Sequence, residues 1–169
     1  MAWEYFKKDD FFITGRFKDY VDKLWVLNQI QQSHIRRLVD LYAIAAIVGL
    51  KKNRMLENEP SDEKRTVQLK QIIENYKTLS GIMTLVLLLD ESRGLSPEER
   101  IRSAFRNPES EEEYRVNMEL FNSYARGGIE YMYGQLVTRI PDDDEEDHED
   151  NRLTNIIAFV KNSMEPDEL

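Results

Sequence analysis

The sequence predicts an all-α protein, a compact bundle of about five to six helices followed by an acidic linker and a C-terminal amphipathic helix. Glycine and proline, which interrupt helices, are scarce: the 169 residues include seven glycines and five prolines. Apolar residues recur at the three- and four-residue spacings of one helix face. No segment sustains the alternation that is typical of strands, so we expect no strands.

The net charge of -9 comes from one part of the chain. Residues 1–140 contain 21 Lys and Arg and 21 Asp and Glu, whereas residues 141–169 contain 2 basic and 11 acidic residues. We therefore predict a charge-balanced helical core domain over residues 1–140, followed by an acidic linker plus short C-terminal helix over residues 141–169. The first part is long enough to bury its own core.

The composition also limits the chemistry and the location of the protein. The chain has no cysteine, which excludes disulfides and thiolate catalysis. Its first residues include acidic side chains and lack the uninterrupted apolar stretch of a signal peptide. The apolar run at residues 41–50 is about half as long as a membrane span. We predict a cytoplasmic protein with no membrane contact.

Two helices are expected early in the chain, after an irregular aromatic arm over residues 3–13. The first helix spans about residues 15–28. The second begins near Ser33, a favourable N-cap. Its middle, residues 43–48, is apolar on all sides, which indicates packing against several neighbours. Small residues along it would allow close approach of another helix, and the helix is expected to stop near the last of them or at Asn53. These small residues are Ala43, Ala45, Ala46 and Gly49.

The middle of the chain is expected to hold one longer helical stripe. Residues 51–60 form a polar connection that ends in proline, and Ser61 is expected to cap the next helix. An apolar stripe continues across Ser80 and Gly81, where we expect a kink or a break. The stripe ends in five consecutive apolar residues, 85–89, which should be deeply buried.

The clearest capping signal is the run Ser96, Pro97, Glu98 and Glu99. Ser at the N-cap, Pro at the first helical position and Glu at the third form a capping box. A short helix should therefore start here and run to about residue 106.

Ser110 opens the last core helix, which should reach about residue 139. Gly127 and Gly128 lie in its interior, where each weakens a helix by about 1 kcal/mol relative to Ala. Such a pair indicates tight packing against another backbone, or a kink.

The C-terminal part combines a charge run and an amphipathic segment. Residues 142–150 carry eight acidic residues and are expected to form a solvated linker. Apolar residues at helical spacing then predict a helix over residues 153–164. A helix this short is marginal on its own in water, so it should dock on the core or on a partner. Its predicted partner-binding residues are Leu153, Ile156, Ile157 and Val160.

The sequence carries no pattern of catalytic or metal-binding residues. His34 and His148 lie far apart and match no metal-ligand spacing. There is no glycine-rich phosphate loop, no serine-nucleophile motif and no Glu-x-x-His pair of the kind that holds metals in helical bundles. The acidic run lacks the glycine and the ligand order of a calcium loop. We predict that the protein is not an enzyme and has no catalytic residue, metal or cofactor.

Basic residues near helix ends are the candidate contact sites. Such cations commonly balance the helix dipole and aid solubility; the alternative is contact with phosphate or with a protein partner. Because the core has no net charge, we do not expect tight DNA binding by this chain alone. The candidate residues are Lys51, Lys52, Arg54, Arg100, Arg102 and Arg126.

Three segments share features with one known family. Residues 42–54 (YAIAAIVGLKKNR) form an alanine-rich apolar stretch that ends in a Gly-aliphatic step followed by Lys, Lys and Asn. Residues 124–130 (YARGGIE) contain an Ala-x-Gly-Gly step, and the run at residues 85–89 is followed by Asp90 and Glu91. In type and order these segments resemble a small accessory protein family encoded with DNA phosphorothioation (backbone sulfur modification) systems.

The resemblance spans about residues 17–137. It implies an accessory component of a prokaryotic DNA-modification or phage-defence locus, in a family without an assigned reaction, and it supplies no catalytic residues. Residues 141–169 depart from the family's pattern.

Two functions follow as hypotheses. In the first, the protein is a non-enzymatic adaptor that binds protein partners from the same gene cluster, with any contact to nucleic acid indirect. In the second, it is an acidic DNA mimic or autoinhibitory regulator, in which residues 142–150 compete with phosphates for a basic groove in another protein or on the Lys51–Arg54 patch. Deletion of residues 141–169 would separate the two, because only the mimic predicts nucleic-acid affinity that appears on deletion and falls with salt.

Overall fold

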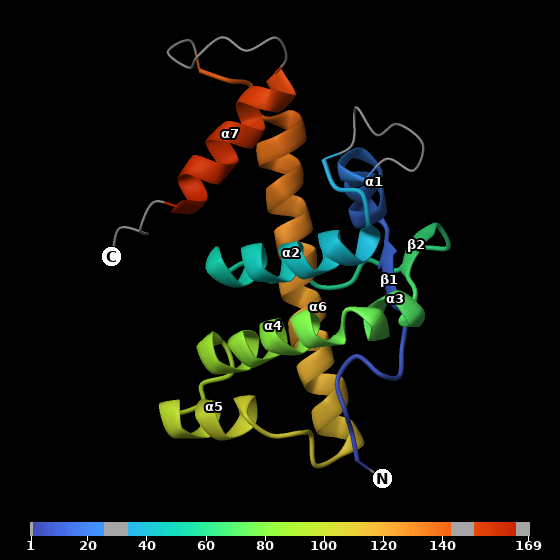
Figure 1. The fold of residues 1–169 in the computed structure, drawn as a ribbon, viewed down its shortest axis with the longest axis vertical. Helices are drawn as coiled ribbons and strands as arrows, with labels where there is room; N and C mark the ends of the chain where they lie inside the picture. The colour runs from blue at the N-terminus through green and yellow to red at the C-terminus, as the bar shows by residue number, and fades with distance from the viewer. Residues whose placement is uncertain (1, 26–33, 143–150, 165–169) are drawn as a thin grey trace.

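The longest element of the fold is α6 (Glu111–Tyr133), a helix of 23 residues. In the computed structural model, which describes residues 2–25, 34–142 and 151–164, three helices lie one above another across α6 (Figure 1). The all-α prediction is confirmed in its main part, since helices make up most of the described chain. The three crossing helices are α2 (Leu38–Lys51), α4 (Tyr76–Leu89) and α5 (Pro97–Ala104).

The remaining elements complete the core around this arrangement. Helix α1 (Arg16–Leu24) packs beside α6, and the short α3 (Leu69–Glu74) leads into α4. Helix α7 (Asn151–Met164) lies beside the C-terminal end of α6 (Figure 1). None of the helices in the described ranges is long and apolar enough to cross a membrane.

The expectation that the chain has no strands was wrong. Phe11–Thr14 (β1) pairs antiparallel with Lys64–Val67 (β2), with Phe11 opposite Val67. Strand β1 does alternate, with Phe12 exposed between buried neighbours, but four residues are too few for a periodicity to be recognised. The aromatic arm does pack on the helices, as expected: the Phe11 ring stacks on Tyr42 of α2 with centroids 4.4 Å apart.

Several helix boundaries differ from the prediction. Helix α1 ends at Leu24, and α2 begins at Leu38; the expected cap Ser33 lies outside the described residues. Ser61 caps no helix, because the chain continues into β2. Helix α4 runs unbroken through residues 80–81, and the break falls at Asn75, between α3 and α4. Gly81 is exposed with nothing near it, so no packing demand bends the helix there.

The N-caps of α5 and α6 are confirmed. Ser96 accepts a hydrogen bond from the backbone of Glu99, whose carboxylate accepts one from the Ser96 backbone, at 3.2 and 2.8 Å. Ser110 accepts from the Glu113 backbone at 3.1 Å. Helix α6 is shorter than expected as an α-helix, since it changes to a π-helix, η1 (Gly134–Thr138), at its C-terminal end.

Helices α2 and α6 cross at backbone contact, which confirms the tight packing expected from their small residues. A Cβ atom on Gly49 would collide with the Tyr124 carbonyl, and one on Gly128 would collide with the Ala45 carbonyl. A Cβ on Gly127 would collide with the carbonyl of Arg54, just beyond α2. Three glycines therefore set how closely the two helices approach.

The end of α2 is a Schellman turn that directs the chain back over α6. Asn53 adopts a left-handed conformation with φ of 49°, which Asn tolerates better than most residues. Its N–H bonds to the Leu50 carbonyl, and the Arg54 N–H bonds to the Gly49 carbonyl at 2.8 Å. The turn places Arg54 against Gly127.

A buried carboxylate joins the end of α4 to α6. Asp90 is 1% exposed and accepts hydrogen bonds from the Ser92 hydroxyl, the Tyr124 hydroxyl and the Arg93 guanidinium, at 2.6, 2.6 and 2.8 Å. Burial raises the pKa of Asp90, but these hydrogen bonds outweigh it and hold the pKa below its ordinary value. Burial and the bond to Asp90 raise the pKa of Tyr124.

The prediction that residues 85–89 are deeply buried was only half right. Val86 and Leu87 are buried, whereas Leu85 and Leu89 are 45% and 55% exposed. Five consecutive residues cover more than a full turn of a helix. They cannot all face the core, because the core lies on only one side of α4.

Helix α7 docks through a polar centre rather than a purely apolar face. Asn155 is buried; its side-chain amide donates to the Arg139 carbonyl at 2.9 Å and accepts from the Arg139 guanidinium at 3.0 Å. Ile156 packs against the core, whereas Leu153 and Val160 are 46% and 49% exposed. The predicted apolar face is therefore divided between the core and solvent.

Candidate binding site at the crossing of two helices

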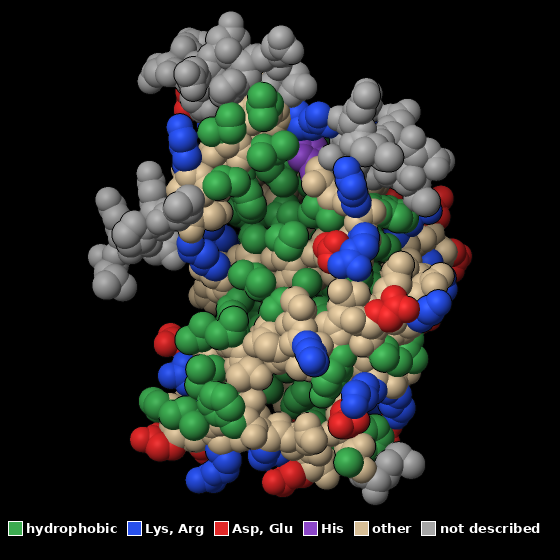
Figure 2. Space-filling model, viewed as in Figure 1, with side chains coloured by type: hydrophobic (Ala, Val, Ile, Leu, Met, Phe, Trp, Pro, Cys, Tyr) green, Lys and Arg blue, Asp and Glu red, His purple; other side chains and the backbone are tan. Residues whose placement is uncertain are grey.

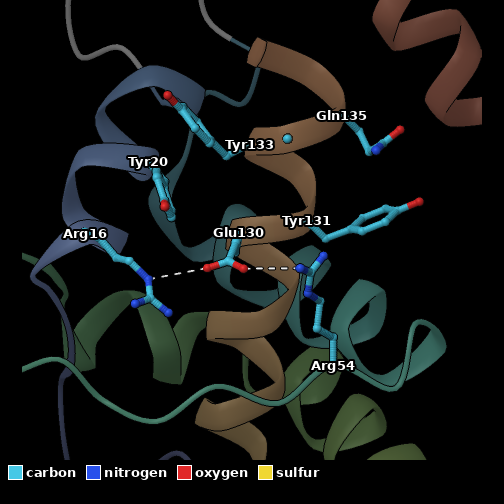
Figure 3. Close-up of a pocket in the computed structure, with 8 residues that line it drawn as sticks. Arg16, Tyr20, Arg54, Glu130, Tyr131, Tyr133 and Gln135 are labelled. Atoms are coloured by element: carbon cyan, nitrogen blue, oxygen red, sulfur yellow. Dashed lines mark hydrogen bonds and ion pairs between the residues drawn. The ribbon is translucent and has the colours of Figure 1, made fainter. Parts of the chain in front are cut away.

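An open pocket of about 580 Å³ lies where α1, α6 and the end of α2 meet. Figure 3 shows Arg16 of α1, Glu130 of α6 and Arg54 beyond α2 directed toward one another. Eight residues line it: Arg16, Tyr20, Arg54, Glu130, Tyr131, Tyr133, Gly134 and Gln135.

Glu130 lies between two arginines in this pocket (Figure 3). Its carboxylate is 3.4 Å from Nε of Arg16 and 3.2 Å from Nη2 of Arg54. Arg16 is also 3.3 Å from Glu59. The three contacts link residues that are far apart in sequence.

These contacts are longer than the tightest arginine–carboxylate pairs among the described residues. Arg106 bonds to both oxygens of Glu113 at 2.9 and 2.6 Å, and Arg65 bonds to Asp22 at 2.6 Å, near the usual length for charge-assisted bonds. The side chains of Arg16 and Arg54 remain 46% and 45% exposed. Both arginines are therefore held in position and keep N–H groups that can donate further hydrogen bonds.

Tyrosine rings form the rest of the pocket wall. Tyr20 of α1 stacks on Tyr133 of α6 with ring centroids 4.3 Å apart. Tyr131 projects on the other side of α6, beside Arg54 (Figure 3). The ammonium of Lys52 lies 5.5 Å from the centroid of the Tyr131 ring. All three rings are only partly buried.

The predicted basic residues do not form one patch. Arg54 lines the pocket and Lys52 adjoins it, whereas the Lys51 ammonium donates to the Ser163 carbonyl of α7 at 2.5 Å. Arg100 and Arg102 lie on α5, at the other end of α6 (Figure 1).

The prediction of Arg126 as a contact residue was wrong. Its side chain is 6% exposed and bonds to Glu119 at 2.8 Å and to the Leu56 carbonyl at 3.1 Å. These bonds connect the segment that follows α2 to helix α6.

Sequence reasoning missed most of the pocket. No sequence pattern links its residues Arg16, Tyr20, Tyr131 and Tyr133. They lie on different helix faces, and Arg16 follows an irregular arm. One usable signal was the Tyr-Met-Tyr-Gly run at residues 131–134, where two aromatic residues flank the buried Met132.

A second hollow is apolar and lies between α2 and α4. We call it the α2–α4 groove; it encloses about 440 Å³. Figure 2 shows hydrophobic side chains gathered over the ends of α2, α4 and α5 on this face. The groove is lined by Ile47, Leu50, Lys51, Asn53, Leu85, Leu89, Glu91 and Tyr124.

Two expectations concern the acidic run and the metal ligands. Of the acidic run at residues 142–150, only Asp142 is among the described residues, so the DNA-mimic hypothesis stays a prediction. Within the described ranges no three His, Asp or Glu side chains gather as metal ligands.

No family model matches the chain, and comparison with curated proteins and with solved structures also finds no match. The two longer segments behind the family resemblance, residues 42–54 and 124–130, do meet at the α2–α6 crossing. Their contact explains why both are rich in small residues, but membership of that family stays a prediction.

Proposed function

We propose that this protein is a non-enzymatic adaptor that binds a helix of another protein in the α2–α4 groove. The observation that carries the proposal is the exposure of aliphatic residues that converge on one groove. Ile47, Leu85 and Leu89 are 44%, 45% and 55% exposed there.

Single exposed apolar side chains are ordinary on protein surfaces, but a convergent set is typical of an interaction site. Full burial of one such side chain is worth about 1.5–3 kcal/mol. Neighbouring positions extend the apolar surface. Ile44 precedes Ile47 by about one turn of α2, and Ile101 of α5 and Phe105 just beyond it are exposed. A partner that covers this face would therefore gain substantial binding energy.

The shape and charge of the groove suit an amphipathic helix. Its walls are two helices, so a third helix can lie between them with apolar residues at three- and four-residue spacing. Glu91 lines the groove with its side chain 86% exposed and would pair with basic residues on the flank of that helix. Such pairs favour one orientation of the bound helix.

The sequence resemblance suggests where to seek the partner. It leads us to propose a product of the same DNA-modification or phage-defence gene cluster.

The test is co-purification with each neighbouring gene product, using the full chain and the double variant Leu85→Lys/Leu89→Lys. We expect the wild type to retain one of them and the variant to lose it, because two charges would be placed in the groove. Val116→Lys on α6 is the matched control, since Val116 is 55% exposed and does not line the groove. A wild-type protein that retains none of these partners, or a groove variant that binds as well as the control, would contradict the proposal.

A further inference from the structure

The geometry points to a nucleotide-binding site in the pocket of Arg16, Arg54 and the three tyrosines, one that takes a phosphate joined to a planar base. The inference does not depend on the proposed adaptor function, because the pocket and the α2–α4 groove are lined by different residues.

The charge of the pocket favours an anion. Its lining holds the guanidinium groups of Arg16 and Arg54 and the carboxylate of Glu130, and Glu59 lies 3.3 Å from Arg16. With the Lys52 ammonium beside Tyr131, three cations face two carboxylates, a local net charge of +1 in a protein whose net charge is -9. A phosphate is therefore attracted here although the chain as a whole is acidic.

The two arginines have donors left for a ligand. Their contacts to carboxylates use Nε and Nη1 of Arg16 and Nη2 of Arg54. In the described part of the chain, nothing accepts a hydrogen bond from Nη2 of Arg16 or from Nε and Nη1 of Arg54. These N–H groups can each donate a charge-assisted hydrogen bond to a phosphate oxygen, so a phosphate can be held while the links to Glu130 keep both arginines in place.

The tyrosines provide surfaces for the base. Tyr131 projects beside Arg54 with its ring partly exposed (Figure 3), and both residues line the same pocket. Stacking on an aromatic ring tolerates any base because every base has a π face. The Gln135 side-chain amide also lines the pocket and offers both a donor and an acceptor.

Gly134 leaves part of the pocket wall without a side chain. Its backbone is right-handed helical, with φ of -60° and ψ of -41°, which any residue can adopt. Nothing lies within 4 Å of a Cβ built there, so packing does not exclude a side chain. A glycine at a helix end in the wall of a pocket lets a ligand approach the backbone closely.

The test is binding of two probes to the full chain: fluorescein-labelled oligothymidylate of about ten nucleotides, followed by anisotropy, and AMP, followed by calorimetry. Binding of AMP would assign the site to free nucleotides, and binding of the oligonucleotide alone would assign it to units of a single strand. Either result supports the site; binding of neither probe overturns it.

Variants distinguish a site from general electrostatic attraction. We expect Arg16→Gln and Arg54→Gln each to weaken binding about tenfold, and Tyr131→Leu to weaken it about tenfold through lost stacking. Arg115→Gln is the matched control, because Arg115 is 73% exposed on α6 and is not part of the pocket. If the control weakens binding as much as Arg54→Gln, the pocket is not the site.

Glu130→Gln separates a binding role from a structural one. The substitution removes the negative charge that competes with phosphate, so a nucleotide site predicts tighter binding, by several-fold. A purely structural triad predicts lower thermal stability and no gain in affinity, which would overturn the inference. Thermal unfolding of every variant shows that each measurement refers to folded protein.

Discussion

Single glycines control how closely the two central helices approach. At Gly49, Gly127 and Gly128 the atom that a Cβ would meet is backbone of the crossing segment, not the end of a flexible side chain. Backbone cannot move aside without separating the helices. The same residue type has no such role at Gly81 of α4, which faces open space.

We expect Gly128→Ala to lower the free energy of unfolding by about 3 kcal/mol or more, because the new methyl group displaces the Ala45 carbonyl. Gly81→Ala should instead raise it by about 0.5–1 kcal/mol, since alanine favours the helix. Urea unfolding of both variants measures the difference. Equal effects at the two positions would show that α2 and α6 are not in backbone contact.

The Asp90 carboxylate makes stability depend on pH. Because the pKa of Asp90 is lower in the folded protein than its ordinary value of about 3.9, its contribution is present above that value and is lost as the pH falls through the folded pKa. Asp90→Asn should cost about 2 kcal/mol at neutral pH, through the loss of charge-assisted bonds to Ser92 and Arg93. Denaturant unfolding at pH 7 and pH 3 tests this, since the difference between wild type and variant should shrink at the lower pH.

At the scale of elements, local signals predicted the starts of α5 and α6 but not the start of α2, and they wrongly predicted a helix at Ser61. The caps at Ser96 and Ser110 could be predicted because a cap is formed by residues within one turn. The β1–β2 pair could not, because its partners are separated by fifty residues or more and each strand has only four residues. The exposure of Leu85 and Leu89 depends on which neighbours cover α4, and a local sequence pattern does not contain this information. The pocket likewise forms only where three distant parts of the chain meet.

The contacts of helix α7 include one buried polar pair, whose part in docking can be tested separately. Asn155→Ala removes both hydrogen bonds to Arg139 and should cost about 1–3 kcal/mol of docking free energy. We expect faster amide hydrogen exchange across α7 with no change in α2 or α6. Asn162→Ala, at an exposed position of the same helix, should leave exchange unchanged; if both variants behave alike, the Asn155 pair does not hold the helix.

At the scale of the whole molecule, the buried hydrophobic residues of the described chain all lie between Tyr5 and Leu136. The aromatic arm is part of this core, since Phe6 and Tyr42 both pack edge-on against Phe121 of α6. The N-terminal residues are thus structural, whereas α7 contributes no fully buried hydrophobic residue.

We therefore expect a chain that ends at residue 140 to keep a cooperative core. Its melting temperature should fall by only a few degrees, because little apolar surface is buried by α7. Thermal unfolding followed by circular dichroism checks this, with deletion of residues 2–8 as the contrasting variant that should unfold the protein. A truncated chain without a sharp transition would show that the two predicted parts are one cooperative unit.

The crossing of α2 and α6 also has a consequence for the order in which the protein folds. Helix α2 carries apolar residues around most of its circumference, yet the glycines that it packs against lie about eighty residues later in the chain. On the ribosome, α2 emerges long before its partner does, and at about 5–20 residues per second it waits several seconds with its apolar surface uncovered. We expect nascent chains that stop before α6 to bind chaperones, and release to follow the emergence of Gly128.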